Sequence, residues 1–293
     1  MQCNLITLSI INIKVTMNKL YYLLISLIFV SCSNDEPEPE TFMQIASITN
    51  EGEYISQQFS YDSYGRIITY RSIYPTETVT VEYEYVSDNL IKITTKDINF
   101  SRNGIYDVVR TYQDNLHLEN GRAVYCEGIF CQTEQDKTTI EKKYLHEFSY
   151  TSSNLLNVVK WTEWNKEGDV WAEDKPWTWE NFYYWENGNI VKIEDFNGNS
   201  YPSVTYTINY TDIAGVQNVV PLPMGRYQYI PLQFKGIFGA KSVSLISEVH
   251  RDDSLNGITS TSYRYEFAGN RITQYQKSRD NEMEETFSVL WTE

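Results

Sequence analysis

Histidine, cysteine and basic residues are scarce in this chain of 293 residues, and each shortage excludes a class of function. The three His stand alone, with no His-x-x-His spacing, so we do not expect a metal hydrolase. The four Cys include no second pair that would complete a zinc site, and no metal or cofactor is predicted. Lys and Arg total 24 against 39 Asp and Glu, a net charge of −15. Because phosphate contacts need a basic surface, we expect no nucleic-acid partner.

Long apolar runs are lacking as well, except near the N-terminus. After Met17-Asn-Lys, the apolar run Leu20–Val30 is only 11 residues long, whereas roughly 20 are needed to cross a bilayer. A short basic start, an apolar run and a small residue before Cys32 are typical of a secretory signal. We therefore interpret residues 1–31 as a signal peptide and Met17 as its true start, because the preceding stretch adds only Lys14 and a second apolar run.

The residues around Cys32 predict how the exported protein is held. Phe29-Val30-Ser31-Cys32 resembles a bacterial lipobox, which implies that Cys32 is acylated and inserts into outer-membrane lipid. The alternative is an ordinary signal peptide with an incidental Cys. Residues 32–41 then form the anchor and a solvated tether, because alternating Pro and Glu cannot bury apolar area. An acidic cluster after a lipidated Cys resembles the export signal of Bacteroidetes surface lipoproteins. It implies a cell-surface location, with the periplasmic face as the alternative.

Two of the remaining cysteines are close in sequence. Cys126 and Cys131 are separated by four residues, and an exported protein can form disulfides. A disulfide that closes this short loop is the expectation, and two buried free thiols are the alternative.

The chain from residue 42 to residue 293 repeats one pattern and is expected to be a single domain. An aromatic alternation leads into a short polar turn, and a β-branched alternation leads out. Val79, Val81 and Tyr83 fall on one face of such a strand, while Glu82 and Glu84 fall on the other. Asn-Gly and Asp-Asn turns supply the positive φ values of tight hairpins. The turns lie near residues 62–65, 88–89, 120–121, 151–154, 187–188, 211–215 and 268–270.

Seven such hairpins predict an all-β fold. The expected fold is an antiparallel up-and-down meander of about 14 strands. Closure into a barrel would remove the exposed edges of this sheet, and flattening into a sandwich is the alternative. A barrel of this width cannot be filled by its own side chains, so a closed one would hold a cavity.

The lipobox, the acidic tether and the repeated hairpins together resemble Bacteroidetes lipoproteins of unknown function that are assigned a porin-like fold. The segment from Pro231 to Lys241 resembles one that such proteins carry before their last hairpins. The resemblance implies a porin-like β fold but brings no known activity and no site. The unit Tyr61-Asp62-x-x-Gly65-Arg66 also resembles the tyrosine-aspartate repeats of bacterial cell-surface proteins, in one copy.

Composition favours a tethered barrel outside the bilayer over a transmembrane pore. A lipid-facing wall confines its aromatics to two girdles, whereas Tyr83 and Tyr85 lie in mid-strand, and the chain ends in Trp291-Thr-Glu rather than in an aromatic residue.

A cluster of tryptophans is the strongest candidate site. Six of the seven Trp fall between Trp161 and Trp185. Trp beside carboxylates can stack on sugar rings and leave the acids to bond their hydroxyl groups. The candidate ligand platform consists of Trp161, Trp164, Trp171, Trp177 and Trp179. The alternative is that these side chains fill the core.

We therefore expect a lipid-anchored binding or structural protein of the cell surface, with a glycan or another small ligand as its partner. We favour a binding protein over an enzyme. The two alternatives are a glycan-acting hydrolase that uses an acidic pair near the Trp cluster and a transmembrane β-barrel pore.

Overall fold

The computed structural model describes residues 44–293, apart from residues 51, 53–54, 101–107, 135–136, 174–175, 199–200, 215, 223–228, 240, 281–282 and 293. Gln44–Glu293 form one compact unit. The predicted signal peptide, Cys32 and the tether lie outside the described residues. Within the described part of the chain, no helix has the length and apolar character needed to span a membrane.

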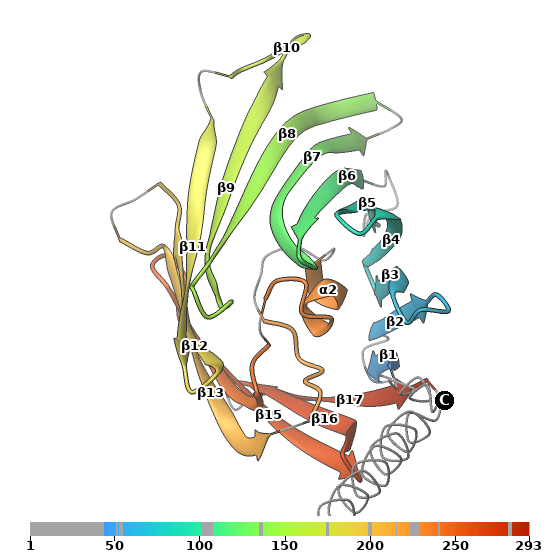
Figure 1. Cartoon of the computed structure of the whole chain (residues 1–293), viewed down its shortest axis with the longest axis vertical. Helices are drawn as coiled ribbons and strands as arrows, with labels where there is room; N and C mark the ends of the chain where they lie inside the picture. Colours follow the sequence, from blue (N-terminus) through green and yellow to red (C-terminus); the bar gives the residue numbers. More distant parts are fainter. Residues whose placement is uncertain are drawn as a thin grey trace, which may run out of the picture. The chain divides into compact units, whose positions relative to one another are not determined.

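The described unit is an all-β meander that closes on itself (Figure 1). The strands are β1 (Ile45–Asn50), β2 (Ile55–Tyr61), β3 (Ile67–Tyr74), β4 (Glu77–Ser87), β5 (Leu90–Asn99), β6 (Val108–Glu119), β7 (Arg122–Glu134), β8 (Lys137–Tyr150), β9 (Leu156–Glu167), β10 (Val170–Trp171), β11 (Trp177–Glu186), β12 (Asn189–Phe196), β13 (Val204–Ala214), β14 (Ser244–Asp253), β15 (Gly257–Ala268), β16 (Arg271–Arg279) and β17 (Met283–Trp291). Neighbours pair antiparallel, and β1 pairs with both β2 and β17, which closes a ring of 16 strands. The short β10 pairs only with β9.

Six of the seven predicted hairpin turns join consecutive strands of the barrel. The hairpin predicted near residues 211–215 is wrong, because residues 211–214 belong to β13 and the next strand, β14, begins only at Ser244. The barrel has 16 strands where about 14 were predicted. In the turns Asn120-Gly121 and Asn187-Gly188, all four residues have positive φ, between 49° and 78°, as a type I′ hairpin turn requires. The six turns account for 12 strands, and the weaker copy near residues 208–215 marks β13. Besides β14 and the short β10, the strands missed are β1 and β17, which pair with each other across the ends of the chain. No hairpin turn joins β1 to β17, so no local sequence pattern predicted this pairing.

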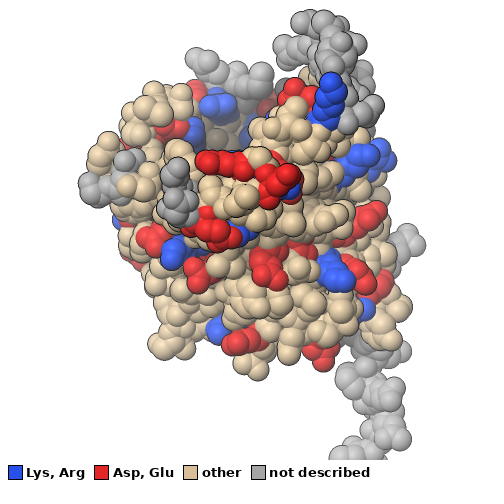
Figure 2. Space-filling view, turned by 90° about the horizontal axis from the view of Figure 1, so that it is seen from above, with Lys and Arg blue, Asp and Glu red and all other residues tan. Residues whose placement is uncertain are grey.

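Strand alternation divides the wall into an inner and an outer face. Val79, Val81 and Tyr83 are buried on the inner face with Ile91 and Ile93, their neighbours on the next strand. At the outer positions of β4 and β5, polar residues lie opposite each other on the two strands: Thr80 with Lys96, Glu82 with Thr94, and Glu84 with Lys92. Figure 2 shows acidic and basic side chains spread over the face seen from above. On these strands the outer face is polar and charged.

The segment between β13 and β14 fills one end of the barrel. It carries the short helix α2 (Ile230–Phe234), which lies inside the ring of strands in Figure 1. Tyr229 and Leu232 are fully buried, and Phe238 is nearly so. The segment is fixed to the wall by hydrogen bonds from the backbone N–H of Ala123 to Ile237 O, 2.8 Å, and from the N–H of Val243 to Gly188 O, 3.3 Å. The described residues of this segment, 216–222, 229–239 and 241–243, are called the plug below.

Aromatic contacts join the plug to the inner wall. The Tyr229 ring lies edge-on to Phe148 and Phe238, and its hydroxyl is 2.6 Å from Nδ1 of His146. Plug and inner wall therefore form one hydrophobic core. The plug explains the long gap before the last predicted hairpin, and it supplies the interior that 16 strands cannot fill with their own side chains.

Candidate functional site

The two ends of the barrel differ in what lines them. The tight turns 120–121 and 187–188 lie at the end that holds the plug, since Ala123 and Gly188 both bond plug residues. Connections between antiparallel strands alternate between the two ends, so β9 joins β11 at the opposite end. We call this opposite end the far end. The inner face there carries charged and aromatic side chains in place of the apolar core.

A cavity of about 620 Å³ lies at the far end, within the size range of small-molecule sites. It is lined by Lys142, Glu163, Asn165, Trp177, Trp179, Asp195, Asn197, Ser203 and Val204. These residues come from β8, β9, β11, β12 and the start of β13. Strand register brings them together: Trp177 is opposite Glu163, Asn165 is opposite Lys142, and Val204 is opposite Asp195. We call it the far-end cavity.

Three of the predicted tryptophans lie on the inner face at this cavity, at graded depth. Trp161 is 4% exposed, and its Nε1 donates a hydrogen bond to Asn181 Oδ1 at 2.7 Å. Trp179 stacks on Trp161 with ring centroids 5.7 Å apart and an interplanar angle of 9°. Trp177 is 63% exposed. Trp161 is thus part of the core, whereas Trp177 offers a free aromatic face.

Charged groups surround this aromatic face. Lys142 Nζ donates to Glu163 Oε2 at 3.1 Å. Burial raises the pKa of Asp195, and a hydrogen bond with the Asn181 side chain opposes that rise. The carboxylates accept hydrogen bonds, while Lys142 and the amide of Asn165 can donate them. A flat apolar ring beside such groups matches the alternating apolar and hydroxyl faces of a sugar.

The other two tryptophans of the predicted platform lie on the outer face. Trp161 and Trp164 are three residues apart on β9, so alternation sends their side chains to opposite faces. Trp164 and Trp171 line an outer groove of about 690 Å³ with Lys143 and Glu173. Lys143 Nζ lies 5.2 Å and 5.6 Å from the centroids of these two rings and pairs with Glu173. The five tryptophans therefore line two surfaces, not one platform.

The expected disulfide between Cys126 and Cys131 is not formed. Both lie on β7, where a rise of about 3.4 Å per residue puts their Cα atoms roughly 17 Å apart. A disulfide needs Cα atoms within about 7 Å. Their odd separation also points them to opposite faces: Cys126 is buried and Cys131 is partly exposed. The sequence between them is extended strand, and no loop is available to close.

Sequence reasoning found the tryptophans of the far-end cavity but missed Lys142, Asn165 and Asp195. These side chains come from β8, from the far part of β9 and from β12. The register between neighbouring strands places these side chains beside Trp177 and Trp179. This register joins residues that are far apart in the sequence, so no local motif predicts it.

Two crystal structures of porin-like proteins are similar to this fold. The protein from Bacteroides uniformis ATCC 8492 has a TM-score of 0.51 and 14% identity, over 85% of this chain and 96% of that chain. The protein from Bacteroides vulgatus ATCC 8482 has a TM-score of 0.53 and 12% identity, over 85% of this chain and 98% of that chain. No family model and no curated protein matches the sequence. At these identities the similarity establishes the fold, and this chain has a porin-like β-barrel.

Proposed function

We propose that this protein is a binding protein of the outer membrane, tethered through acylated Cys32 at the cell surface, which holds a glycan in the far-end cavity. The observation that carries the proposal is the cavity itself. It places the exposed ring of Trp177 beside the Lys142–Glu163 ion pair and the Asp195 carboxyl. Burial of a sugar ring against Trp177 supplies apolar contact, and the polar groups supply the hydrogen bonds that orient the sugar.

Two features support a binding barrel in preference to a pore. The plug occupies one end of the lumen with buried aromatic residues, among them Tyr229 and Phe238. The outer wall carries Glu82, Glu84 and Lys92 at mid-strand positions. On the lipid face of a barrel, a Lys costs up to about 2–4 kcal/mol and a Glu costs less, but both are unfavourable. A wall of this kind favours water on its outside. Channel activity of the purified protein in a planar bilayer would contradict this part of the proposal.

The test of binding uses a panel of neutral gluco-, manno- and xylo-oligosaccharides. A matching member should change the Trp fluorescence, and Trp177→Ala should weaken its binding by about tenfold or more, as expected for loss of a stacked ring. Trp171→Ala is the matched control, because Trp171 lies on the outer groove, and it should leave the affinity unchanged. Equal loss in both variants would reject the far-end cavity as the site.

A glycan-acting hydrolase is the second candidate, favoured by one observation. Two carboxyl groups, Glu163 and Asp195, line the same cavity, and burial raises the pKa of Asp195, as a general acid requires. Release of reducing ends from a bound oligosaccharide would identify an enzyme. Asp195→Asn should then abolish product release while binding persists. Binding without product release favours the binding protein.

A further inference from the structure

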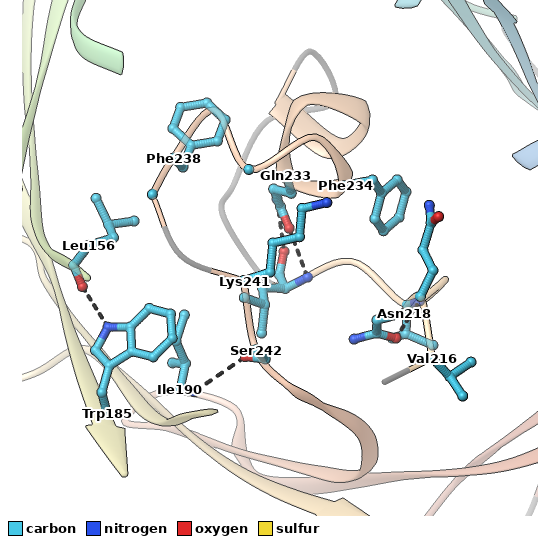
Figure 3. A pocket seen from close by; sticks show the side chains of 15 residues that line it. Leu156, Trp185, Ile190, Val216, Asn218, Gln233, Phe234, Phe238, Lys241 and Ser242 are labelled. Carbon is cyan, nitrogen blue, oxygen red and sulfur yellow. Dashed lines mark hydrogen bonds between the residues drawn. The ribbon is translucent and has the colours of Figure 1, made fainter. Parts of the chain in front are cut away.

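A second cavity lies at the plug end of the barrel, between the plug and the inner wall, and it differs in chemistry from the far-end cavity. Its volume is about 190 Å³. The apolar lining comes from the wall strands and from the plug: Leu156, Trp185, Ile190, Val220, Phe234 and Phe238 (Figure 3). Leu156, Ile190, Val220 and Phe238 are buried. We call it the plug cavity.

Three polar side chains at the plug cavity are already used within the protein. Gln233 accepts a hydrogen bond from the N–H of Leu222 at 3.0 Å and donates one to Leu222 O at 3.4 Å. Asn218 Oδ1 accepts from the N–H of Val220 at 3.0 Å. Ser242 Oγ accepts from the N–H of Ile190 at 3.3 Å. These bonds hold the plug in place (Figure 3).

Lys241 is the charged group of this cavity. Its side chain packs over Gly236, where an added Cβ would come within 3.3 Å of Lys241 Cε, and it extends toward Gln233 and Phe234 in Figure 3. Within the described part of the chain, no carboxylate pairs with Lys241. Part of the Lys241 side chain is exposed to solvent, and the partial burial of the rest lowers the pKa of its ammonium.

A second ammonium adds positive potential at this end of the barrel. Lys235 does not line the cavity, but burial first, and then the charge of Lys241, lower its pKa, while Asp62 acts in the opposite direction. The plug cavity therefore combines an apolar interior with a local excess of positive charge, in a chain whose net charge is −15.

We infer that the plug cavity binds a small carboxylate with a compact apolar group, the apolar group among Leu156, Ile190 and Phe238 and the carboxylate at Lys241. An apolar protein cavity of about 150 Å³ holds benzene, so 190 Å³ fits a phenyl ring or a chain of about six carbons. A single lining ammonium matches a single negative charge. A hydrogen bond between an ammonium and a carboxylate is stronger than one between neutral groups, so Lys241 favours a carboxylate over an uncharged head group.

The test uses hexanoate and benzoate as probes of the purified protein, with hexan-1-ol as the uncharged control. Binding is measured by calorimetry and located by the methyl NMR signals of Leu156, Ile190 and Val220. Hexanoate should shift these signals and bind more tightly than hexan-1-ol. Lys241→Met keeps the apolar stem and removes the charge, and it should weaken hexanoate binding by about tenfold or more, to the level of the alcohol.

Two further variants separate a site at Lys241 from general attraction of anions. Lys241→Arg restores the charge and should bind hexanoate within about threefold of the original affinity, and Lys235→Met, outside the cavity lining, should do the same. Each variant is first shown to melt as the original protein does. The inference is overturned if hexanoate leaves the three methyl signals unmoved, or if Lys241→Met binds it as tightly as the original protein.

Discussion

At the scale of single residues, depth along the inner face of the barrel decides whether a tryptophan of that face belongs to the core or to the surface. Trp161 is 4% exposed, stacks on Trp179 and bonds Asn181, whereas Trp177 is 63% exposed. We expect Trp161→Ala to lower the free energy of unfolding by about 3–5 kcal/mol, because it leaves a large cavity. Trp177→Ala should change it by no more than about 0.5 kcal/mol. Urea unfolding of the two variants measures the difference.

The same two variants test the premise of the binding proposal, which is that the Trp177 ring is exposed. If Trp177→Ala costs as much stability as Trp161→Ala, the Trp177 ring is packed in the core. The far-end cavity would then offer no aromatic face to a sugar, and the proposal would lose its main support.

Asp97 on the inner face predicts a stability that falls as pH rises. Burial, and then the charge of Glu77, raise the pKa of Asp97 to about 6, although its carboxylate lies 3.2 Å from Arg110. The unfolded chain has a pKa near 3.9 at such a residue. The folded state therefore binds the proton more tightly, and this contribution to stability is full below about pH 4 and is lost as pH rises through about 6. Asp97→Asn should remove this pH dependence, measured by urea unfolding from pH 4 to pH 7.

Asp253 provides a control, because its contribution to stability changes with pH in the opposite direction. Hydrogen bonds from the Asn256 side chain and the N–H of Leu255 lower the pKa of Asp253 to about 2. This carboxylate stabilises the fold above about pH 4, and the contribution is lost as pH falls toward 2. Asp253→Asn should therefore destabilise the protein more at pH 6 than at pH 3. The same trend with pH in both variants would contradict these assignments.

At the scale of elements, the hairpins could be predicted because each one is a local event. Alternation over five or more residues and an Asn-Gly turn are both contained within a stretch of about 20 residues. The pairing of β1 with β17, by contrast, joins Ile48 to Val289, and the two-residue strand β10 leaves no periodic signal. The far-end cavity depends on register between β8, β9, β11 and β12, so only its tryptophans could be found from the sequence.

The tight turns differ in how much of the fold depends on them. Gly188 O accepts the N–H of Val243 from the plug, and a Cβ at Gly188 would come within 3.3 Å of the Val243 side chain. A Cβ at Gly269, in the turn between β15 and β16, would meet nothing within 4 Å. We expect a four-residue insertion after Gly269 to be tolerated, and the same insertion after Gly188 to lower the melting temperature by loosening the plug.

An insertion after Ile193 is the reference for a fully disruptive change in this comparison. Ile193 is fully buried in β12, so an insertion there shifts the register of the wall and should prevent folding. Thermal melts followed by circular dichroism rank the three. If the insertions after Gly269 and Gly188 behave alike, the plug does not depend on its bond to Gly188.

At the scale of the whole barrel, the plug leaves two separate cavities. Sixteen strands enclose more space than their side chains fill. The plug fills one end and leaves the polar far-end cavity at the other, and its own fit against the wall leaves the smaller plug cavity. The sequence indicated that a wide closed barrel would hold a cavity, and that the segment from Pro231 to Lys241 resembles one carried by porin-like lipoproteins before their last hairpins. It could not place that segment inside the barrel, because the packing of Phe238 against Phe148 is a long-range contact.

The last prediction concerns what holds the molecule at the membrane. The outer wall pairs Glu84 with Lys92 across two strands and Glu147 with Lys160 across two others, so its charged side chains would have to lose their water to enter lipid. Under the proposed acylation of Cys32, attachment to the membrane should therefore depend on the acyl chain alone. Cys32→Ala should move the protein from the membrane fraction to the soluble fraction of the cell, and Cys131→Ala, at a partly exposed thiol of the wall, should leave it in the membrane fraction. Fractionation followed by immunoblotting measures both. Retention of Cys32→Ala in the membrane would mean that the wall itself contacts the bilayer, and the pore would then replace the tethered binding protein as the better account.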